Sequence, residues 1–329
     1  MQFTLGQFTD QPATQLRLLA TRGRFVSTEP GALKVGRRAA LATKIARPTL
    51  SNGTMQTRFT ASRVRMRLHS QRDGALNWLL LPGGPGIGSE SLEGLADALD
   101  VPGAIWLIDL PGDGSNIVEG DPYAKWPGVL AEAAAEVPDA VYVGHSTGGA
   151  YLLSCQALRG NVRGIALVDT APNCTWHPRY VQMTKDHPLP EFDAALARYL
   201  SDQTQANLAA LCVASAEWNF NPAGLEAGRA LLAAMPYNAT AVEWSDKNFD
   251  HSYRATWWPE VPLLRMAGTD DRIVSQDDWS APEYHTPNAL HWLVPGAGHF
   301  PWIENPEAVA EGFRRLSRSI EATTIQQNP

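Results

Sequence analysis

From residue 62 onward, short apolar runs alternate with segments of helical periodicity. The runs that we expect to form strands are 63–68, 76–81, 104–108, 140–143, 162–168, 261–266 and 289–294. Helices are expected at 89–99, 129–137, 147–158 and 306–320. Strands that alternate with helices are joined by parallel crossovers, so the pattern predicts an α/β fold whose mostly parallel sheet is covered on both faces.

The alternation stops at residues 172–259, where helical patterns follow one another without a clear strand. This segment holds twelve aromatic residues in 88 positions, a density typical of a lid over an apolar pocket. We therefore expect 55–171 and 260–329 to form the core and 172–259 a helical lid. Trp218, Trp244 and Phe300 are the candidate substrate-binding residues.

Residues 1–54 carry eight basic and two acidic side chains, a net charge of +6 in a chain of net charge −7. We interpret this stretch as a poorly ordered extension, with a transit peptide and then an export signal as alternatives. Met55 begins the globular pattern and is a candidate for the true start. The remaining chain is acidic, which argues against nucleic acid as a partner because phosphate binding needs clustered basic residues.

Cysteine content and hydropathy bear on the compartment. The three cysteines, Cys155, Cys174 and Cys212, have neither metal-ligand nor redox spacing and are typical of a reducing compartment. No apolar run approaches the roughly 18 residues of a membrane helix. We expect a cytoplasmic protein that acts on a small molecule and not at a membrane, and the oligomeric state stays open.

The most informative motif is Gly144-His-Ser146-Thr-Gly148, which lies between an expected strand and an expected helix. A serine in such a tight turn needs small residues two positions before and after it. The turn lifts the Ser146 hydroxyl above the sheet and directs the N-terminus of the next helix toward it, where partial positive charge favours an anion. Ser146 is therefore a candidate nucleophile.

A serine hydroxyl needs a base, and the base needs an acid to orient it. His299 follows the last expected strand in a Gly-rich loop, and Asp270 and Asp271 follow the strand before it. We select His299 as the base and Asp271 as the acid, with Asp270 expected to shape its loop. Asp169, after the strand at 162–168, is a further candidate.

An oxyanion formed at Ser146 would need two backbone N–H groups. Thr147, at the start of the helix, is the first candidate donor. Gly84, in the Pro-Gly-Gly-Pro-Gly loop that follows the strand at 76–81, is the second. Glycines in that loop allow the backbone to approach a ligand closely.

Together, these motifs resemble the α/β-hydrolase superfamily over about residues 62–320. The loop at Gly84 is similar to that of the proline iminopeptidase-like branch, although Pro82 stands where that branch has histidine, and Thr147 departs from its usual tryptophan. The resemblance implies the α/β-hydrolase fold with a Ser146–Asp271–His299 triad. Ser146 in place of an aspartate argues against the dehalogenase and epoxide-hydrolase branches.

The leading hypothesis is hydrolysis of a small, largely apolar carboxylic ester through an acyl-enzyme. The alternative is an aminopeptidase or amidase, which would need lid carboxylates such as Glu217, Glu243, Asp246 or Asp250 to hold a substrate ammonium. A C–C hydrolase, an acyl transferase and a non-catalytic binding protein are further alternatives. No cofactor is expected and no metal site, since the histidines and acids lack ligand spacing.

Overall fold

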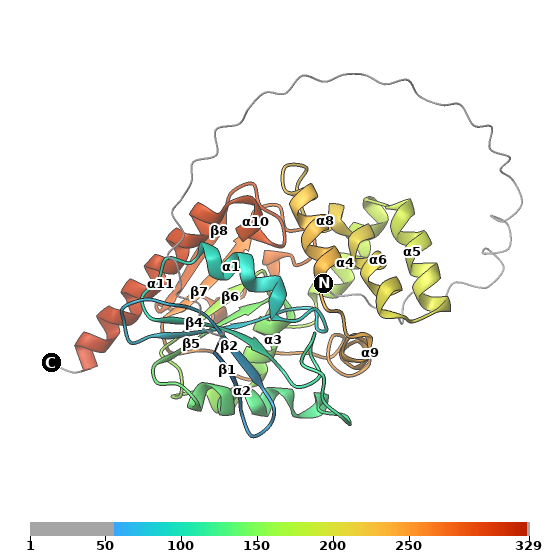
Figure 1. Ribbon diagram of the computed structural model, residues 1–329. Helices are drawn as coiled ribbons and strands as arrows, with labels where there is room; N and C mark the ends of the chain where they lie inside the picture. Colours follow the sequence, from blue (N-terminus) through green and yellow to red (C-terminus); the bar gives the residue numbers. More distant parts are fainter. Residues whose placement is uncertain (1–55, 328–329) are drawn as a thin grey trace, which may run out of the picture. The chain divides into compact units, whose positions relative to one another are not determined.

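The structure, a computed structural model, describes residues 56–327 (Figure 1). The N-terminal extension expected at 1–54, and the possible start at Met55, lie outside the described residues. Within the described part, no helix is long and apolar enough to cross a membrane.

Eight strands form one sheet in the order β1-β2-β4-β3-β5-β6-β7-β8. The first two strands pair antiparallel, β2 also pairs antiparallel with β4, and every later pairing is parallel. This confirms the predicted mostly parallel sheet. The bounds are β1 Thr57–Phe59, β2 Arg65–Gln71, β3 Asn77–Leu81, β4 Ala104–Asp109, β5 Ala140–His145, β6 Gly164–Val168, β7 Leu263–Gly268 and β8 Ala289–Val294.

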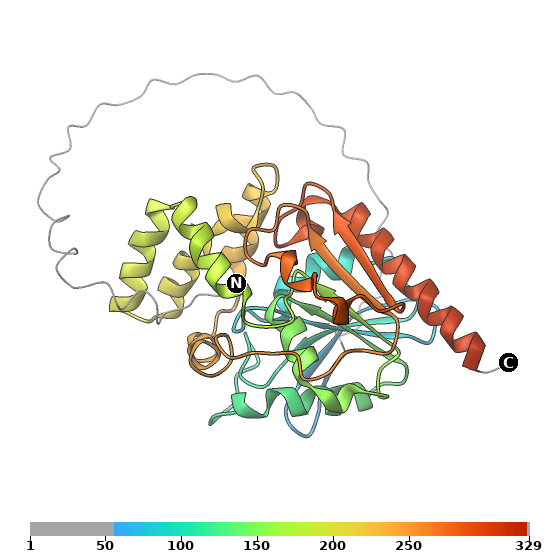
Figure 2. The same cartoon turned by 180° about the vertical axis from the view of Figure 1, so that it is seen from behind.

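Helices cover both faces of the sheet (Figures 1 and 2). On one face lie α1 (Glu93–Ala98), α10 (Pro301–Glu304) and α11 (Pro306–Gln327); on the other lie α2 (Trp126–Ala135) and α3 (Thr147–Ser154). Strands β4, β5 and β6 are buried along their whole length, because helices shield both of their faces.

A helical insertion, residues 172–259, connects β6 to β7. Its helices are α4 (Trp176–Asp186), α5 (Pro190–Ser201), α6 (Gln205–Ala214), α7 (Ala216–Asn219), α8 (Leu225–Ala234) and α9 (Ala239–Asn248). Because β6 and β7 are parallel neighbours, the insertion leaves the sheet at the carboxyl end of β6, the edge at which β5 delivers Ser146.

Two of the expected helices are interrupted in the structure. The helix expected at 89–99 is a 3₁₀ turn, Ser89–Leu92, followed by the short helix α1, and neither Ser89 nor Ser91 caps α1. The Ser89 hydroxyl instead donates to buried Asp109, at 2.9 Å. The helix expected at 147–158 ends at Ser154, and a separate 3₁₀ turn follows at Gln156–Leu158.

Candidate active site

Ser146 lies in a strained turn between β5 and α3. Its backbone has φ 52° and ψ −123°, a conformation that costs a non-glycine residue on the order of 1–3 kcal/mol. A Cβ on Gly144 would lie 2.6 Å from Gly149, and one on Gly148 would lie 2.5 Å from the carbonyl oxygen of Pro82. The glycines at both motif positions are therefore required by close backbone approach.

Neighbouring strands hold this turn in place. The backbone N–H of Ser146 donates to the carbonyl of Val168, the last residue of β6, at 2.9 Å. The hydroxyl of Thr170 donates to the Ser146 carbonyl at 2.6 Å, and the Thr170 carbonyl accepts from the indole of Trp279 at 2.8 Å. The strain at Ser146 is thus balanced by hydrogen bonds from the adjacent β6 segment.

His299 lies within hydrogen-bond distance of both Ser146 and Asp271. Its Nε2 is 3.0 Å from Ser146 Oγ, and its Nδ1 is 3.0 Å from Asp271 Oδ2. The imidazole is fully buried, and the Asp271 side chain is 1% exposed. Ser146 is 153 positions from His299, and Asp271 is 28 positions from it, yet the three side chains meet at the carboxyl edge of the sheet.

The structure also distinguishes Asp271 from Asp270. Asp271 Oδ1 accepts the backbone N–H groups of Ile273 at 2.8 Å and Val274 at 3.2 Å, which leaves Oδ2 for His299. Asp270 is exposed, and its Oδ2 accepts from the side chain of Asn221 at 2.9 Å. Asp270 therefore ties its loop to the insertion and does not contact the imidazole.

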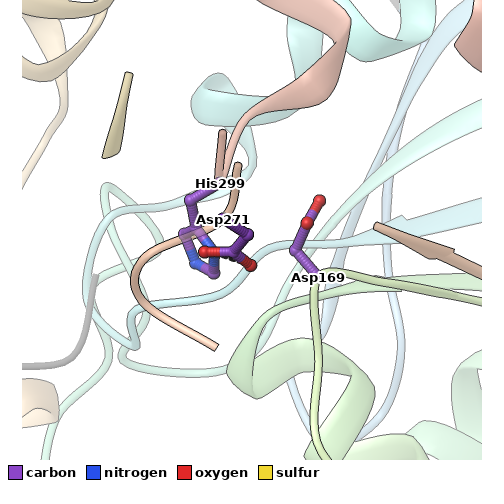
Figure 3. Close-up of side chains that lie close together, drawn as sticks. All are labelled: Asp169, Asp271 and His299. Carbon is purple, nitrogen blue, oxygen red and sulfur yellow. Dashed lines mark hydrogen bonds and ion pairs between the residues drawn. The ribbon is translucent and has the colours of Figure 1, made fainter. Parts of the chain in front are cut away.

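Asp169 lies beside this pair, as Figure 3 shows. Oxygen atoms of Asp169 and Asp271 and a nitrogen of His299 lie within 4.8 Å of one another, and residues of these types can bind a metal ion. However, Asp169 Oδ1 accepts the Gly268 N–H at 2.9 Å, and both oxygens of Asp271 face donors. These hydrogen bonds fit an acid–histidine pair with a neighbouring carboxyl group.

Burial dominates the electrostatics of Asp169. The side chain is fully buried, and desolvation, followed by the charge of Asp271, raises its pKa well above the ordinary value of an aspartate. A raised pKa favours the protonated form at neutral pH. Of the two carboxyl groups, Asp271 is the one within hydrogen-bond distance of His299, with Oδ2 3.0 Å from Nδ1.

The loop of His299 is held by residues that the sequence did not single out. The His299 N–H donates to the carbonyl of Asn219 in α7 at 2.9 Å, and His145 Nε2 donates to the His299 carbonyl at 2.8 Å. Glu304 accepts the N–H groups of Gly298 and Asn221, each at 2.6 Å. Such contacts depend on tertiary placement and carry no local motif that would reveal them.

Gly84 and Thr147 lie on the two sides of the turn at Ser146. Gly84 has φ +113°, and its carbonyl accepts from the Thr147 hydroxyl at 3.3 Å. A Cβ on Gly83 would lie 2.6 Å from the Cβ of Ser146, so the loop after β3 passes directly over the serine. The two backbone segments expected to bind an oxyanion are therefore adjacent.

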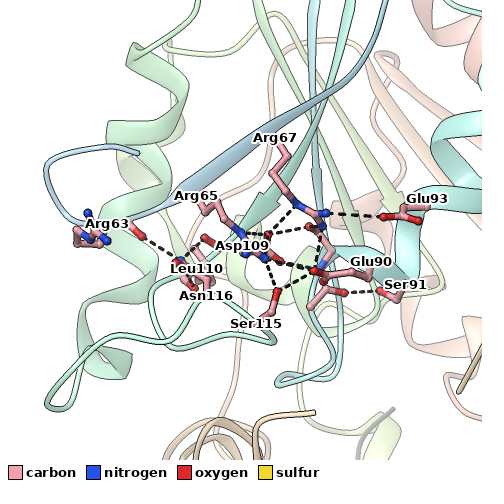
Figure 4. Close-up of polar contacts among 12 residues, drawn as sticks. Arg63, Arg65, Arg67, Glu90, Ser91, Glu93, Asp109, Leu110, Ser115 and Asn116 are labelled. Atoms are coloured by element: carbon pink, nitrogen blue, oxygen red, sulfur yellow. Dashed lines mark hydrogen bonds and ion pairs between the residues drawn. The ribbon is translucent and has the colours of Figure 1, made fainter. Parts of the chain in front are cut away.

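A buried polar network anchors the far end of this loop (Figure 4). Asp109, at the end of β4, accepts the backbone N–H of Ser89 at 2.6 Å and also Arg65 Nε at 3.0 Å. Arg67 lies 3.6 Å from the same carboxylate. Desolvation raises the pKa of Asp109, and the two guanidinium groups oppose that shift.

A cavity opens beside Ser146 between the core and the insertion. The insertion contributes Trp176, Phe249, Asp250 and Tyr253 to its wall, and the core contributes Ala150 and Val274. Three of the ten residues around the cavity are aromatic, two are threonines, and one carries a carboxyl group.

Trp218, Trp244 and Phe300, selected from the sequence as substrate-binding residues, are not among the residues that the structure places around this cavity. Trp218 packs on Phe192 within the insertion, with ring centroids 4.5 Å apart, and Phe300 stacks on Phe220 at 5.1 Å. Trp244 lies 5.9 Å from Trp126. These rings pack within the insertion and between the insertion and the core. Aromatic composition alone does not tell which rings face a cavity.

Comparison with known proteins agrees with this geometry. Residues 78–312 match the family described as "Alpha/beta hydrolase family". The chain belongs to this family. It is a hydrolase by that membership, as the sequence motifs predicted.

Curated relatives of this α/β hydrolase include pimeloyl-[acyl-carrier protein] methyl ester esterases. The protein from Xanthomonas axonopodis pv. citri is 27% identical over 219 residues, which cover 65% of this chain and 84% of that protein. The protein from Xylella fastidiosa (strain M12) is 26% identical over 237 residues, which cover 66% and 85%.

Solved structures share the fold at lower identity. A proline iminopeptidase from Mycobacterium smegmatis has a TM-score of 0.58 at 18% identity and covers 82% of this chain and 100% of its own. A thermophilic esterase from Thermogutta terrifontis has a TM-score of 0.58 at 18% identity and covers 82% and 99%. At this identity, the likeness shows the fold.

Proposed function

We propose that this α/β hydrolase cleaves carboxylic esters through an acyl-enzyme on Ser146. The observation that carries the proposal is the 3.0 Å contact of His299 Nε2 with Ser146 Oγ, continued by the 3.0 Å contact of Nδ1 with Asp271. The names of the curated relatives, which are methyl ester esterases, support an ester as the substrate.

In the first half-reaction, Ser146 Oγ attacks the ester carbonyl carbon while His299 Nε2 takes the hydroxyl proton. The negative charge moves to the carbonyl oxygen, where the N–H groups of Gly84 and Thr147 stabilise it. The C–O bond to the alcohol then breaks, and the imidazolium returns the proton to the leaving alkoxide. Asp271 holds the imidazole in the tautomer with the proton on Nδ1 and stabilises its cation.

In the second half-reaction, His299 takes a proton from water, and the resulting hydroxide attacks the acyl carbon. The tetrahedral intermediate expels Ser146 Oγ, which regains the proton from the imidazolium, and the carboxylic acid leaves. We propose that the helical insertion acts as the lid, because its residues form much of the cavity wall beside Ser146. Its closure would exclude bulk water from the acyl-enzyme.

An aminopeptidase or amidase is the second candidate, supported by the carboxyl group of Asp250 in the cavity wall. Two other acids considered for ammonium binding are engaged at the surface: Glu217 pairs with Arg229 at 3.0 Å, and Glu243 pairs with Lys247. An ester substrate is therefore better supported. The buried, thiol-form cysteines Cys155 and Cys212 are consistent with a cytoplasmic location for this activity.

The test compares the full chain with Ser146→Ala and with Ser201→Ala, an exposed serine in α5, as the matched control. A fluorophosphonate probe should label the wild type and the control but not Ser146→Ala. The same pattern should hold for hydrolysis of p-nitrophenyl butanoate. Labelling that survives in Ser146→Ala would disprove the assignment, and proline naphthylamide cleaved faster than the ester would favour the peptidase.

A further inference from the structure

Glu304, the last residue of α10, bridges the loop of His299 and the helical insertion. Its Oε2 accepts the backbone N–H of Gly298 at 2.6 Å, and its Oε1 accepts the backbone N–H of Asn221 at 2.6 Å. Gly298 directly precedes His299, whereas Asn221 follows α7 of the insertion. One side chain therefore connects two backbone segments that are far apart in the sequence.

The two segments also contact each other directly. The His299 N–H donates to the Asn219 carbonyl at 2.9 Å, and a Cβ on Gly298 would lie 2.3 Å from the same carbonyl oxygen. Phe220, the next residue of the insertion, stacks on Phe300 with ring centroids 5.1 Å apart. The backbone of the histidine loop is therefore packed against the insertion with no space for a side chain at Gly298.

The same stretch of the insertion reaches the loop that follows β7. The Asn221 side chain donates to Asp270 Oδ2 at 2.9 Å and to the Gly296 carbonyl at 3.0 Å. The Arg272 guanidinium donates to the Glu217 carbonyl at 3.1 Å. Both loops of the candidate active site, the one after β7 and the one after β8, therefore rest on this stretch.

An ionised carboxylate suits the two contacts of Glu304 best. Each of its oxygens accepts an N–H group, and N–H groups that bind a charged oxygen form shorter and stronger hydrogen bonds than neutral pairs do. Burial raises the pKa of Glu304, and the hydrogen bonds from Gly298 and Asn221 oppose this shift. A glutamine of the same size has one acceptor oxygen, so it would leave one of the two N–H groups facing its amide nitrogen.

We propose that Glu304 is a positioning residue for the hydrolysis: by holding Gly298 against the insertion, it fixes the 3.0 Å distance between His299 Nε2 and Ser146 Oγ. The proposal rests on the proposed ester hydrolysis at Ser146. Glu304 is not among the residues around the cavity beside Ser146, so it acts through the backbone of the loop. A displacement of about 1 Å in an active site can cost about 100-fold in rate, so a small shift of this loop has a large effect.

The first variant is Glu304→Gln. Its kcat for p-nitrophenyl butanoate should fall about 10- to 100-fold with KM within about threefold, because His299 shifts relative to Ser146 while the cavity wall stays intact. The rate of fluorophosphonate labelling should fall by a similar factor, because labelling needs the activation of Ser146 by His299. Glu132→Gln is the matched control: Glu132 in α2 also accepts a backbone N–H, that of Ser62 at 2.8 Å, and should keep the wild-type rates.

The second variant, Gly224→Ala, displaces the carboxylate without removing it. A Cβ on Gly224 would lie 2.6 Å from Glu304 Cγ, and the φ of Gly224, −91°, is one that alanine adopts. This variant should therefore lower kcat and the labelling rate as Glu304→Gln does. Gly128→Ala is its control, because a Cβ on this exposed glycine of α2 would meet nothing within 4 Å. If Glu304→Gln does not fold, Gly224→Ala decides alone.

A third readout follows the histidine itself. The Nδ1 proton of His299, which lies between the imidazole and Asp271, should give a separate downfield NMR signal in the wild type and in both controls. The signal should shift or broaden in Glu304→Gln and in Gly224→Ala. A substitution that only lowers the melting temperature leaves this signal in place.

The negative results are distinguishable. Folded variants that hydrolyse and label within about threefold of the wild type, with an unchanged Nδ1 signal, would overturn the positioning role and leave the proposed function standing. A lower melting temperature with unchanged kcat would also overturn it, because Glu304 would then only stabilise the fold. Absence of labelling and of hydrolysis in the wild type would overturn the proposed function, and the Nδ1 signal of the variants then decides whether Glu304 positions His299.

Discussion

The backbone N–H of Gly86 donates a 2.7 Å hydrogen bond to the buried carboxyl group of Asp113. On its other side, the Gly86 carbonyl accepts a 2.7 Å hydrogen bond from the N–H of Asn238, which also donates through its side chain to the Gly112 carbonyl at 2.7 Å. Gly86 lies two residues after Gly84, the proposed oxyanion donor. The turn after β4 and the start of α9 therefore position the oxyanion loop together.

Asp113→Ala should lower kcat about 10- to 100-fold with a smaller change in KM. Without its acceptor, the Gly86 N–H is unsatisfied and the loop that carries Gly84 shifts, and displacements of about 1 Å in an active site can cost 100-fold. Asp113→Asn keeps an oxygen that can accept from Gly86 and should stay within about threefold of the wild type. Steady-state kinetics with p-nitrophenyl butanoate measures both variants, and equal kcat values in Asp113→Ala and the wild type would contradict the positioning role.

Asp113 should also make the stability of the protein depend on pH. Desolvation, and next the charge of Asp109, raises its pKa from 3.8 to about 8. Between pH 3.8 and about 8, the folded protein therefore holds this proton, whereas the unfolded chain has released it. The stabilising contribution of this group is complete below pH 3.8 and is lost as the pH rises through about 8.

Urea unfolding of the wild type and of Asp113→Asn at several pH values between 5 and 8 measures this effect. The free energy of unfolding of the wild type should fall relative to that of the variant as the pH rises, by at most about 1.4 kcal/mol per pH unit. Parallel curves for the two proteins would show that Asp113 does not release its proton in this range.

Asp271→Asn should lower kcat by about 10³- to 10⁴-fold with the fold intact, because an amide cannot hold the Nδ1 proton of His299 or stabilise its cation. Asp270→Asn is the matched control, since this neighbouring carboxylate contacts Asn221 and not the imidazole. Asp270→Asn should keep full turnover. The assignment fails if the two variants lose equal activity, or if Asp270→Asn is the more damaged enzyme.

The sheet and the turn at Ser146 were predictable because their signals are local. Buried parallel strands appear in the sequence as short apolar runs. A serine with positive φ in a tight turn requires glycines two positions before and after it, where backbone segments lie close together. The sequence alone does not separate Asp270 from Asp271. Both lie in the same loop, and tertiary packing decides which of the two side chains turns inward.

The sequence carries the least information about the cavity wall. Trp218 and Trp244 were selected from a segment rich in aromatic residues, yet the structure packs both within the protein and places Trp176 and Phe249 beside Ser146. The direction in which an amphipathic helix of the insertion faces is set by its neighbours, and neither periodicity nor composition contains that information. The contact of Asn219 with His299 was missed for the same reason.

Asp169→Asn should keep kcat within about threefold of the wild type at pH 7. Burial and the charge of Asp271 raise the pKa of Asp169 well above its ordinary value, which favours the protonated form, and a neutral amide has the same shape as that form. The amide oxygen can still accept from the Gly268 N–H, whereas Asp169→Ala leaves that donor buried without a partner and should destabilise the protein by about 1–3 kcal/mol. Kinetics and thermal unfolding of the two variants separate these effects. A loss of kcat in Asp169→Asn as large as that in Asp271→Asn would instead show that Asp169 is ionised and shares the acid role. Only an ionised Asp169 could stabilise the His299 cation, so only then would the amide remove a charge that matters for kcat.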